Sequence, residues 1–136
     1  MAVQFGCVGV IVLTGPLVPA GLPARLLLVG AVLLGLWAVL SVGLGKFRIS
    51  PYLHPAGRLL RTGPYRFVRH PMYLSLLLAM LALLIDHWTA LRIGAWLTLV
   101  AVLVLKLRLE ERLLTRRFPE YARYARATYR MLPYLY

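Results

Sequence analysis

Two long stretches without a charged side chain constrain this chain more than any other feature. Residues 1–24 and 26–45 contain no Asp, Glu, Lys or Arg. About 20 apolar residues in a helix cross a hydrocarbon core of about 30 Å. A small soluble domain could not bury the apolar surface of this chain, because 61% of the 136 residues are hydrophobic. The sequence therefore predicts an integral membrane protein.

Hydropathy indicates four apolar segments within one all-α domain. The predicted spans cover residues 3–22, 24–45, 71–86 and 88–106. Gly15-Pro16 and Pro19 predict a kinked or frayed end for the first span, since proline lacks a backbone donor. Asp86 and His87 separate the last two spans and predict the turn of a helical hairpin. We therefore expect a membrane helical bundle of about four transmembrane helices.

The basic residues predict the orientation of these helices. Fourteen of the 16 lysines and arginines fall within residues 46–69 and 106–130, and the formal net charge is +12. Cytoplasmic loops carry the excess of Lys and Arg, so both segments and both termini are expected in the cytoplasm. Arg25 and Arg92 lie near predicted span ends, where they can snorkel to the interface. Long uncharged spans argue against a nucleic acid partner, and Leu-, Arg- and Ala-rich usage indicates a prokaryotic cytoplasmic membrane.

Two segments are predicted outside the spans. A loop covers residues 46–70, and a cytoplasmic helical extension covers residues 106–136. The extension is rich in Leu, Arg, Glu, Lys and Ala, which favour helix. It is expected to continue the fourth span and to break near Phe118-Pro119, because proline interrupts a helix.

The end of the loop carries the first candidate site. Gly63-Pro64 predicts a turn, and Pro71 suits the first turn of a helix. His70 would then lie at the helix N-terminus beside Arg69, where free N–H groups favour a carboxylate. Tyr65 and Tyr73 could add ring faces and hydroxyl groups. The alternative is a basic loop whose aromatic residues only anchor it at the membrane interface.

A pair of adjacent carboxylates follows the fourth span. Glu110 and Glu111 account for half of the four acidic residues in the chain. Lys106 lies four residues before Glu110 and therefore on the same helix face. One interpretation is an ordinary solvated ion-pair face. The functional alternative is an anionic group that meets a cationic ligand, for example a sulfonium with an α-amino group.

Together these motifs resemble the isoprenylcysteine carboxyl methyltransferase family. The resemblance rests on Gly63-Pro64-Tyr65, Arg69-His70-Pro71-Met72-Tyr73, Glu110-Glu111 and the later Leu114, Phe118, Tyr121, Tyr124 and Pro133. It implies an S-adenosylmethionine site made by Leu59, Leu60, Tyr65, Arg69, His70, Pro71, Met72, Tyr73, Glu110 and Glu111. The catalytic or substrate-binding arginine of the family is replaced here by Lys106. Arg108 is the second candidate for that role.

The resemblance implies methyl transfer to a lipophilic acceptor that enters from the membrane, with a carboxyl group as the first expectation. An alternative is phospholipid or amine N-methylation, because phospholipid methyltransferases share a looser form of the pattern. A second alternative is a non-enzymatic basic scaffold that binds anionic lipid head groups. A third is a membrane reductase of the sterol-reductase type with a nicotinamide cofactor. Three histidines without ligand spacing predict no metal site.

Overall fold

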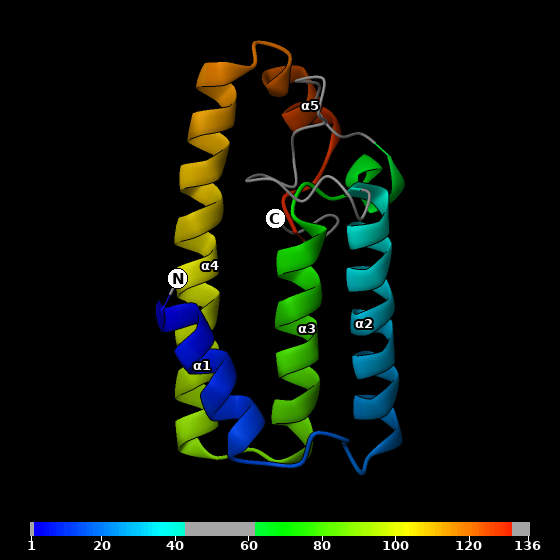
Figure 1. The fold of residues 1–136 in the computed structure, drawn as a ribbon, viewed down its shortest axis with the longest axis vertical. Helices are drawn as coiled ribbons and strands as arrows, with labels where there is room; N and C mark the ends of the chain where they lie inside the picture. Colours follow the sequence, from blue (N-terminus) through cyan, green and yellow to red (C-terminus); the bar gives the residue numbers. More distant parts are fainter. Residues whose placement is uncertain (1, 43–61, 132–136) are drawn as a thin grey trace.

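The computed structural model describes residues 2–42 and 62–131, and over these residues the chain is helical (Figure 1). In chain order the elements are α1 (Ala2–Leu13), α2 (Leu22–Val42), the short 3-10 helix η1 (Gly63–Arg66), α3 (Pro71–Asp86), α4 (Ala90–Arg117) and α5 (Tyr121–Ala127). The described residues contain no named strand, and their one β-bridge joins Val68 to Tyr129. The expected all-α class is confirmed.

Among the described helices, only two are long and apolar enough to cross a bilayer on their own. They are α2, with 21 residues, and α4, with 28 residues. At 1.5 Å per residue, α1 with its 12 residues is about 18 Å long and α3 with its 16 residues about 24 Å. Both are shorter than a hydrocarbon core of about 30 Å. The expected four full spans are therefore not confirmed.

The first predicted span, residues 3–22, is wrong in length. Helix α1 ends at Leu13, and residues 14–21 form turns and bends before α2 begins. The physical reason is local, because Gly15, Pro16 and Pro19 follow within six residues. Two prolines remove two backbone donors, so the helix cannot continue through this segment.

The hairpin between α3 and α4 is present as predicted. Its turn also contacts the connection between α1 and α2, which was not predicted. Helix α3 ends at Asp86, and Thr89 caps α4 by accepting a hydrogen bond from the Arg92 N–H at 3.3 Å. The Asp86 carboxylate accepts hydrogen bonds from the N–H groups of Ala20 and Gly21, both at 2.8 Å. The hairpin turn therefore holds the connection between α1 and α2.

Arg92 was expected to extend to the membrane interface, but it does not. Its side chain is fully buried, and its Nη2 donates to the carbonyl of Ile11 at 3.0 Å while Nη1 donates to the carbonyl of His87. The last carbonyls of a helix lack partners within the helix. Arg92 thus caps the C-terminus of α1, where a positive charge is also favourable. A side chain at Gly15 would meet this guanidinium group within 3 Å.

Small residues bring α2 and α3 close together. Ala24, Ala31 and Ala38 recur every seven residues on α2 and are its buried residues. A Cβ atom at Gly35 would lie 3.1 Å from the Ser75 hydroxyl on α3. Membrane helices use small residues in this way because close backbone approach gains van der Waals contact. In Figure 1 the two helices run side by side in opposite directions.

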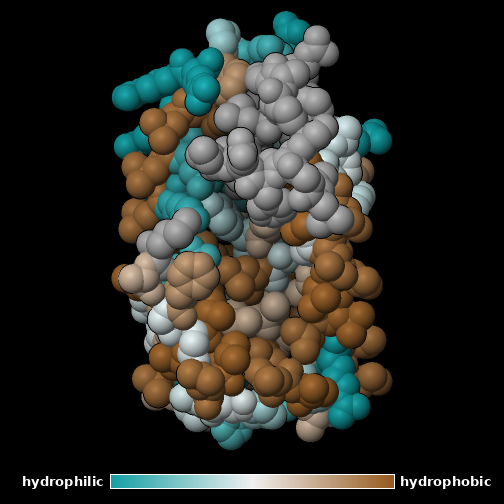
Figure 2. Space-filling model, in the orientation of Figure 1, coloured by the Kyte–Doolittle hydropathy of each residue, from teal (hydrophilic) through white to brown (hydrophobic). Residues whose placement is uncertain are grey.

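Helix α4 continues beyond its predicted span to Arg117, where Phe118 and Pro119 end it as expected. The extension predicted over 106–136 is then broken: α5 covers only seven residues, and the chain is not helical from Thr128 to Met131. Hydrophobic side chains cover the lower part of the molecule in Figure 2, and hydrophilic side chains gather at the end that holds α5. This distribution suits a bundle whose polar end leaves the bilayer.

Candidate functional site

The candidate site lies at the polar end of the bundle, where η1 leads into α3. Gly63 begins η1 with a φ of +58°, a conformation that favours glycine. A Cβ atom there would also meet the Ser41 side chain of α2 within 3 Å. Pro71 then occupies the first turn of α3, with His70 as the N-cap residue. The turn and the helix start predicted from the sequence are both present.

The segment before α3 pairs with the segment after α5. The Arg69 N–H donates to the carbonyl of Tyr129 at 2.8 Å, and the Tyr129 N–H donates to the carbonyl of Phe67 at 3.0 Å. The His70 N–H donates to the carbonyl of Arg130 at 3.0 Å. Chain segments about 60 residues apart in sequence therefore form one wall of the site. The His70 N–H is used in this pairing, so it does not point at a ligand.

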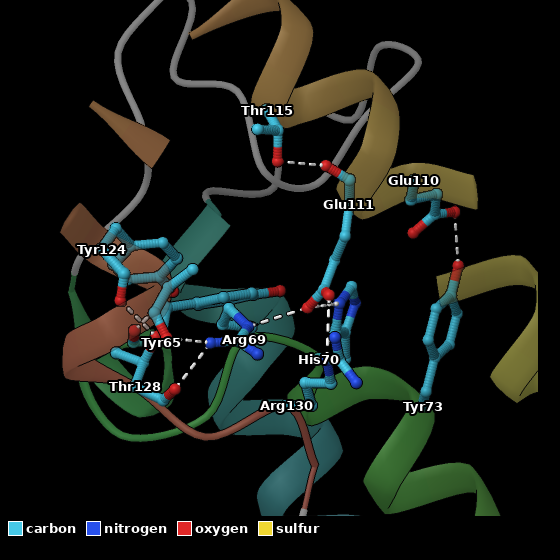
Figure 3. A network of polar contacts seen from close by, with 11 residues as sticks. Tyr65, Arg69, His70, Tyr73, Glu110, Glu111, Thr115, Tyr124, Thr128 and Arg130 are labelled. Atoms are coloured by element: carbon cyan, nitrogen blue, oxygen red, sulfur yellow. Dashed lines mark hydrogen bonds and ion pairs between the residues drawn. The ribbon is translucent and has the colours of Figure 1, made fainter. Parts of the chain in front are cut away.

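Glu111 is the centre of the polar network in Figure 3. Its Oε1 accepts from Arg69 Nε at 2.8 Å and lies 3.3 Å from His70 Nε2, while its Oε2 accepts from Arg130 Nε at 3.0 Å. Burial alone would raise the pKa of Glu111. The hydrogen bond from His70 and the charges of Arg69 and Arg130 outweigh burial and lower the pKa to about 2. Glu111 is therefore ionised and fully engaged by protein groups.

Arg69 extends this network to the C-terminal segment. It is buried, and its Nη1 donates to the carbonyls of Ala125 and Thr128. The guanidinium group of Arg69 thus connects the start of α3 to Glu111 on α4 and to the end of α5. A planar group with five donors suits such a junction better than a lysine ammonium.

Glu110 directly precedes Glu111 on α4, and its side chain has different surroundings. Its Oε1 accepts from the Tyr73 hydroxyl at 2.7 Å, and Lys106 Nζ lies 5.1 Å from the centre of the Tyr73 ring. The Tyr73 ring also stacks on His70, with ring centres 5.6 Å apart. The second oxygen of Glu110, Oε2, is buried and has no hydrogen-bond partner within the described residues.

Three tyrosines line the network toward α2 and α5. The Tyr124 hydroxyl donates to the carbonyl of Tyr65 at 2.7 Å, and Tyr121 packs edge-on against Tyr124. Burial raises the pKa of Tyr65 and of Tyr121 above the usual tyrosine value, so both hydroxyls stay protonated. The Tyr121 hydroxyl is buried without a hydrogen-bond partner in the described part of the chain. It can therefore donate to a bound group.

The structure brings most of the predicted site residues together. Two of them lie at its edge. Met72 packs against the cluster that contains Tyr65 and also lines an apolar groove of about 380 Å³ between α2 and α3, and Arg108 lines a cavity beside Glu111. Leu59 and Leu60 lie outside the described residues. The close group consists of Tyr65, Arg69, His70, Pro71, Tyr73, Lys106, Glu110 and Glu111.

The sequence interpretation missed two participants, Arg130 and Tyr121. Tyr121 belongs to the tail pattern of aromatic residues, which was a usable signal. Arg130 lay among eight basic residues after the fourth span, and nothing in the sequence distinguished it from the others. Across residues 2–42 and 62–131, no group of three or more His, Cys, Asp or Glu side chains could hold a metal ion.

Comparison with known proteins gives one match. A family model described as phospholipid methyltransferase matches residues 21–121, about three quarters of the chain. The matched range includes α2, η1, α3, α4 and the adjacent Glu110 and Glu111. Searches of curated proteins and of solved structures give no significant match.

Proposed function

Since the chain belongs to the phospholipid methyltransferase family, we propose that it transfers a methyl group from S-adenosylmethionine to a lipid-like acceptor at the cytoplasmic face of a membrane. The family is one of methyltransferases, and the apolar helices suit a membrane protein. The observation that carries the choice of cofactor is the buried Glu110 Oε2 without a partner in the described chain.

A buried carboxylate oxygen without a partner costs free energy, about 1–3 kcal/mol or more. A cationic ligand would remove this cost, and S-adenosylmethionine carries a sulfonium and an ammonium group. The surroundings of Glu110 fit such a ligand, because Tyr73 holds one carboxylate oxygen at 2.7 Å and leaves the other available.

When bound, S-adenosylmethionine supplies a methyl group that is already electrophilic. The protein then needs mainly to position two reactants and to exclude water. Glu110 would bind the cation, and Tyr73 would fix the Glu110 side chain. Glu111 would act through structure, because its three protein partners hold the wall formed by residues 67–70 and 128–131.

A carboxylate is the acceptor group that we place first, with Lys106 as the residue that orients it. Lys106 lies one helical turn before Glu110 and packs over the ring of Tyr73, so an acceptor beside Lys106 would lie close to the cofactor. The apolar part of α4 ends at Leu105, so this position suits a head group that stays at the interface. An amine acceptor is the second candidate, since the matching family model is described as phospholipid methyltransferase without naming the methylated group.

The test is a binding titration of the full chain in nonionic detergent. S-adenosylhomocysteine, the expected product, should bind and NADPH should not. Binding of NADPH alone would favour a reductase. Binding of neither compound by folded protein would leave the basic-scaffold interpretation and contradict the proposal.

A further inference from the structure

The C-terminal part of α4 carries an exposed patch that combines apolar and basic side chains. The Leu-Arg patch consists of Leu109, Arg112, Leu113 and Arg116. All four side chains are exposed, the two leucines by 59% and 64%. Because they are three or four residues apart, they adjoin one another on one face of the helix. In Figure 1 this part of α4 extends past the end of α2 and the start of α3.

Most of the Leu-Arg patch lies beyond the bilayer. The apolar part of α4 ends at Leu105. At 1.5 Å per residue, Leu109 lies about 6 Å beyond it, Leu113 about 12 Å and Arg116 about 16.5 Å. A head-group layer is about 5–7 Å thick, so Leu113 and Arg116 lie in water. Removal of apolar surface from water is favourable, and the patch therefore favours a partner that covers it.

The two arginines of the patch are not neutralised by the protein. Within the described part of the chain, Arg112 and Arg116 make no ion pair. Both also line a cavity of about 620 Å³ next to the patch, which leaves room for another group beside each guanidinium. A fitting partner therefore offers negative charge as well as apolar surface.

A second copy of this chain does not fit that description, because the chain has only four acidic residues. Asp86 lies at the opposite end of the bundle, at the end of α3. Glu110 and Glu111 are engaged in the candidate site, and Glu120 also has an interaction within the protein. Two copies that met through this patch would bring like charges together, which opposes association. The partner that fits is a different protein.

We propose that the Leu-Arg patch binds an acidic amphipathic helix of another protein. The spacing suits a helix, because rows of side chains three and four residues apart pack into the grooves of a second helix. Apolar side chains of the partner would cover Leu109 and Leu113, as in other helix-binding surfaces. Its Asp or Glu side chains would accept charge-assisted hydrogen bonds from Arg112 and Arg116. A nucleic acid offers negative charge without apolar side chains, so it matches only half of the patch.

This inference is independent of the proposed methyl transfer. The full chain would be placed in nanodiscs of zwitterionic phosphatidylcholine, and fluorescence anisotropy would measure its binding of three labelled peptides of equal length. The first peptide is an amphipathic helix of Leu, Glu and Ala, the second has Lys in place of Glu, and the third has Ser in place of Leu. Only the first should bind. Leu113→Ser and Arg116→Gln should each weaken its binding roughly 10-fold or more.

Two variants are matched controls, compared at unchanged melting temperature. Leu113→Met keeps an apolar side chain, and Arg123→Gln removes an exposed arginine of α5 outside the patch. Both should bind the first peptide as tightly as the parent protein does. Equally tight binding of the serine peptide would indicate a site for any polyanion. No binding of the first peptide is the result expected if the bilayer covers the patch. Either result, or equal losses in Arg123→Gln and Arg116→Gln, would overturn the proposal.

Discussion

Glu110 and Glu111 are neighbours in sequence but have different surroundings. They point about 100° apart around the helix. Glu111 is held by Arg69, His70 and Arg130, whereas Glu110 has one oxygen on Tyr73 and one buried oxygen without a partner in the described chain. We expect the first arrangement to stabilise the protein and the second to bind the proposed ligand. Their roles are therefore expected to separate under mutation.

Glu110→Gln tests the ligand-binding role. The substitution keeps the shape of the side chain and removes its charge. Loss of a charge-assisted contact should cost about 1.5–3 kcal/mol, which is a loss of about 10- to 150-fold in affinity for S-adenosylhomocysteine. Calorimetric titration would measure it. Glu120→Gln, which removes an exposed carboxylate before α5, should bind normally. Equal affinity of Glu110→Gln and the parent would remove Glu110 from the site.

Lys106→Met distinguishes the two classes of acceptor by the sign of its effect. If the acceptor is a carboxylate, the variant should raise KM or lower the rate while cofactor affinity is unchanged, and Lys106→Arg should retain activity. If the acceptor is an amine, the loss of a repelling charge should be neutral or beneficial. Steady-state methylation of a prenylcysteine analogue and of a phosphatidylethanolamine would measure both. Equal rates of prenylcysteine methylation by parent and variant would exclude Lys106 from substrate binding.

At this scale the sequence was informative where residue types are rare. Two adjacent acids among four in the chain, and a histidine before a helix-starting proline, made Glu110, Glu111 and His70 candidates, and the family resemblance implied that they share one site. The sequence could not show that Glu110 and Glu111 have different roles. That difference depends on which arginines arrive from the C-terminal segment, and basic residues are too frequent there for one to stand out.

Among the elements, the C-terminal segment has the clearest structural role. It is held to the start of α3 by backbone pairing and by Arg69, whose partners lie on α4 and at both ends of residues 125–128. Glu111 neutralises this buried arginine. Removal of the carboxylate would leave a buried charge without compensation, which is more costly than replacement of the whole pair.

Glu111→Gln should therefore lower the free energy of unfolding by about 3–5 kcal/mol. The pH dependence follows from the pKa, which falls from 4.5 to about 2 in the folded protein. A lowered pKa gives stability that is complete above pH 4.5 and is lost as the pH falls toward 2. The parent should lose this contribution over that range, and the variant should not. Denaturant unfolding in detergent at several pH values would measure both, and identical curves would contradict the role of Glu111.

The elements were predictable to different degrees for physical reasons. Helix α3 covers residues 71–86 as predicted, because a proline starts it and two polar residues, Asp86 and His87, end its apolar run. Helix α1 has 12 residues and is shorter than the predicted span 3–22, because Gly15, Pro16 and Pro19 outweigh hydropathy. The burial of Arg92 depends on a helix carbonyl 81 residues away and has no local signal.

For the whole molecule, alternation of α2, α3 and α4 places residues 62–70 and the C-terminal half of α4 with α5 at one end (Figure 1). We expect that end, and both termini, in the cytoplasm. Tags at either terminus of the full chain, probed with protease in sealed inside-out and right-side-out vesicles, would test this. Both tags should be cleaved only in inside-out vesicles. Protection of one tag and cleavage of the other would require an odd number of crossings.

The pairing of residues 67–70 with residues 129–131 also means that the helices are synthesised before the site can assemble. A growing polypeptide that has been synthesised as far as Leu105 already contains α1, α2, α3 and the apolar part of α4, which can enter the bilayer. It still lacks Glu110, Glu111 and the segment that completes the wall. Insertion and assembly of the site are therefore successive events during biosynthesis. A stalled or prematurely terminated polypeptide would be retained in the membrane but would have no place to bind a cofactor.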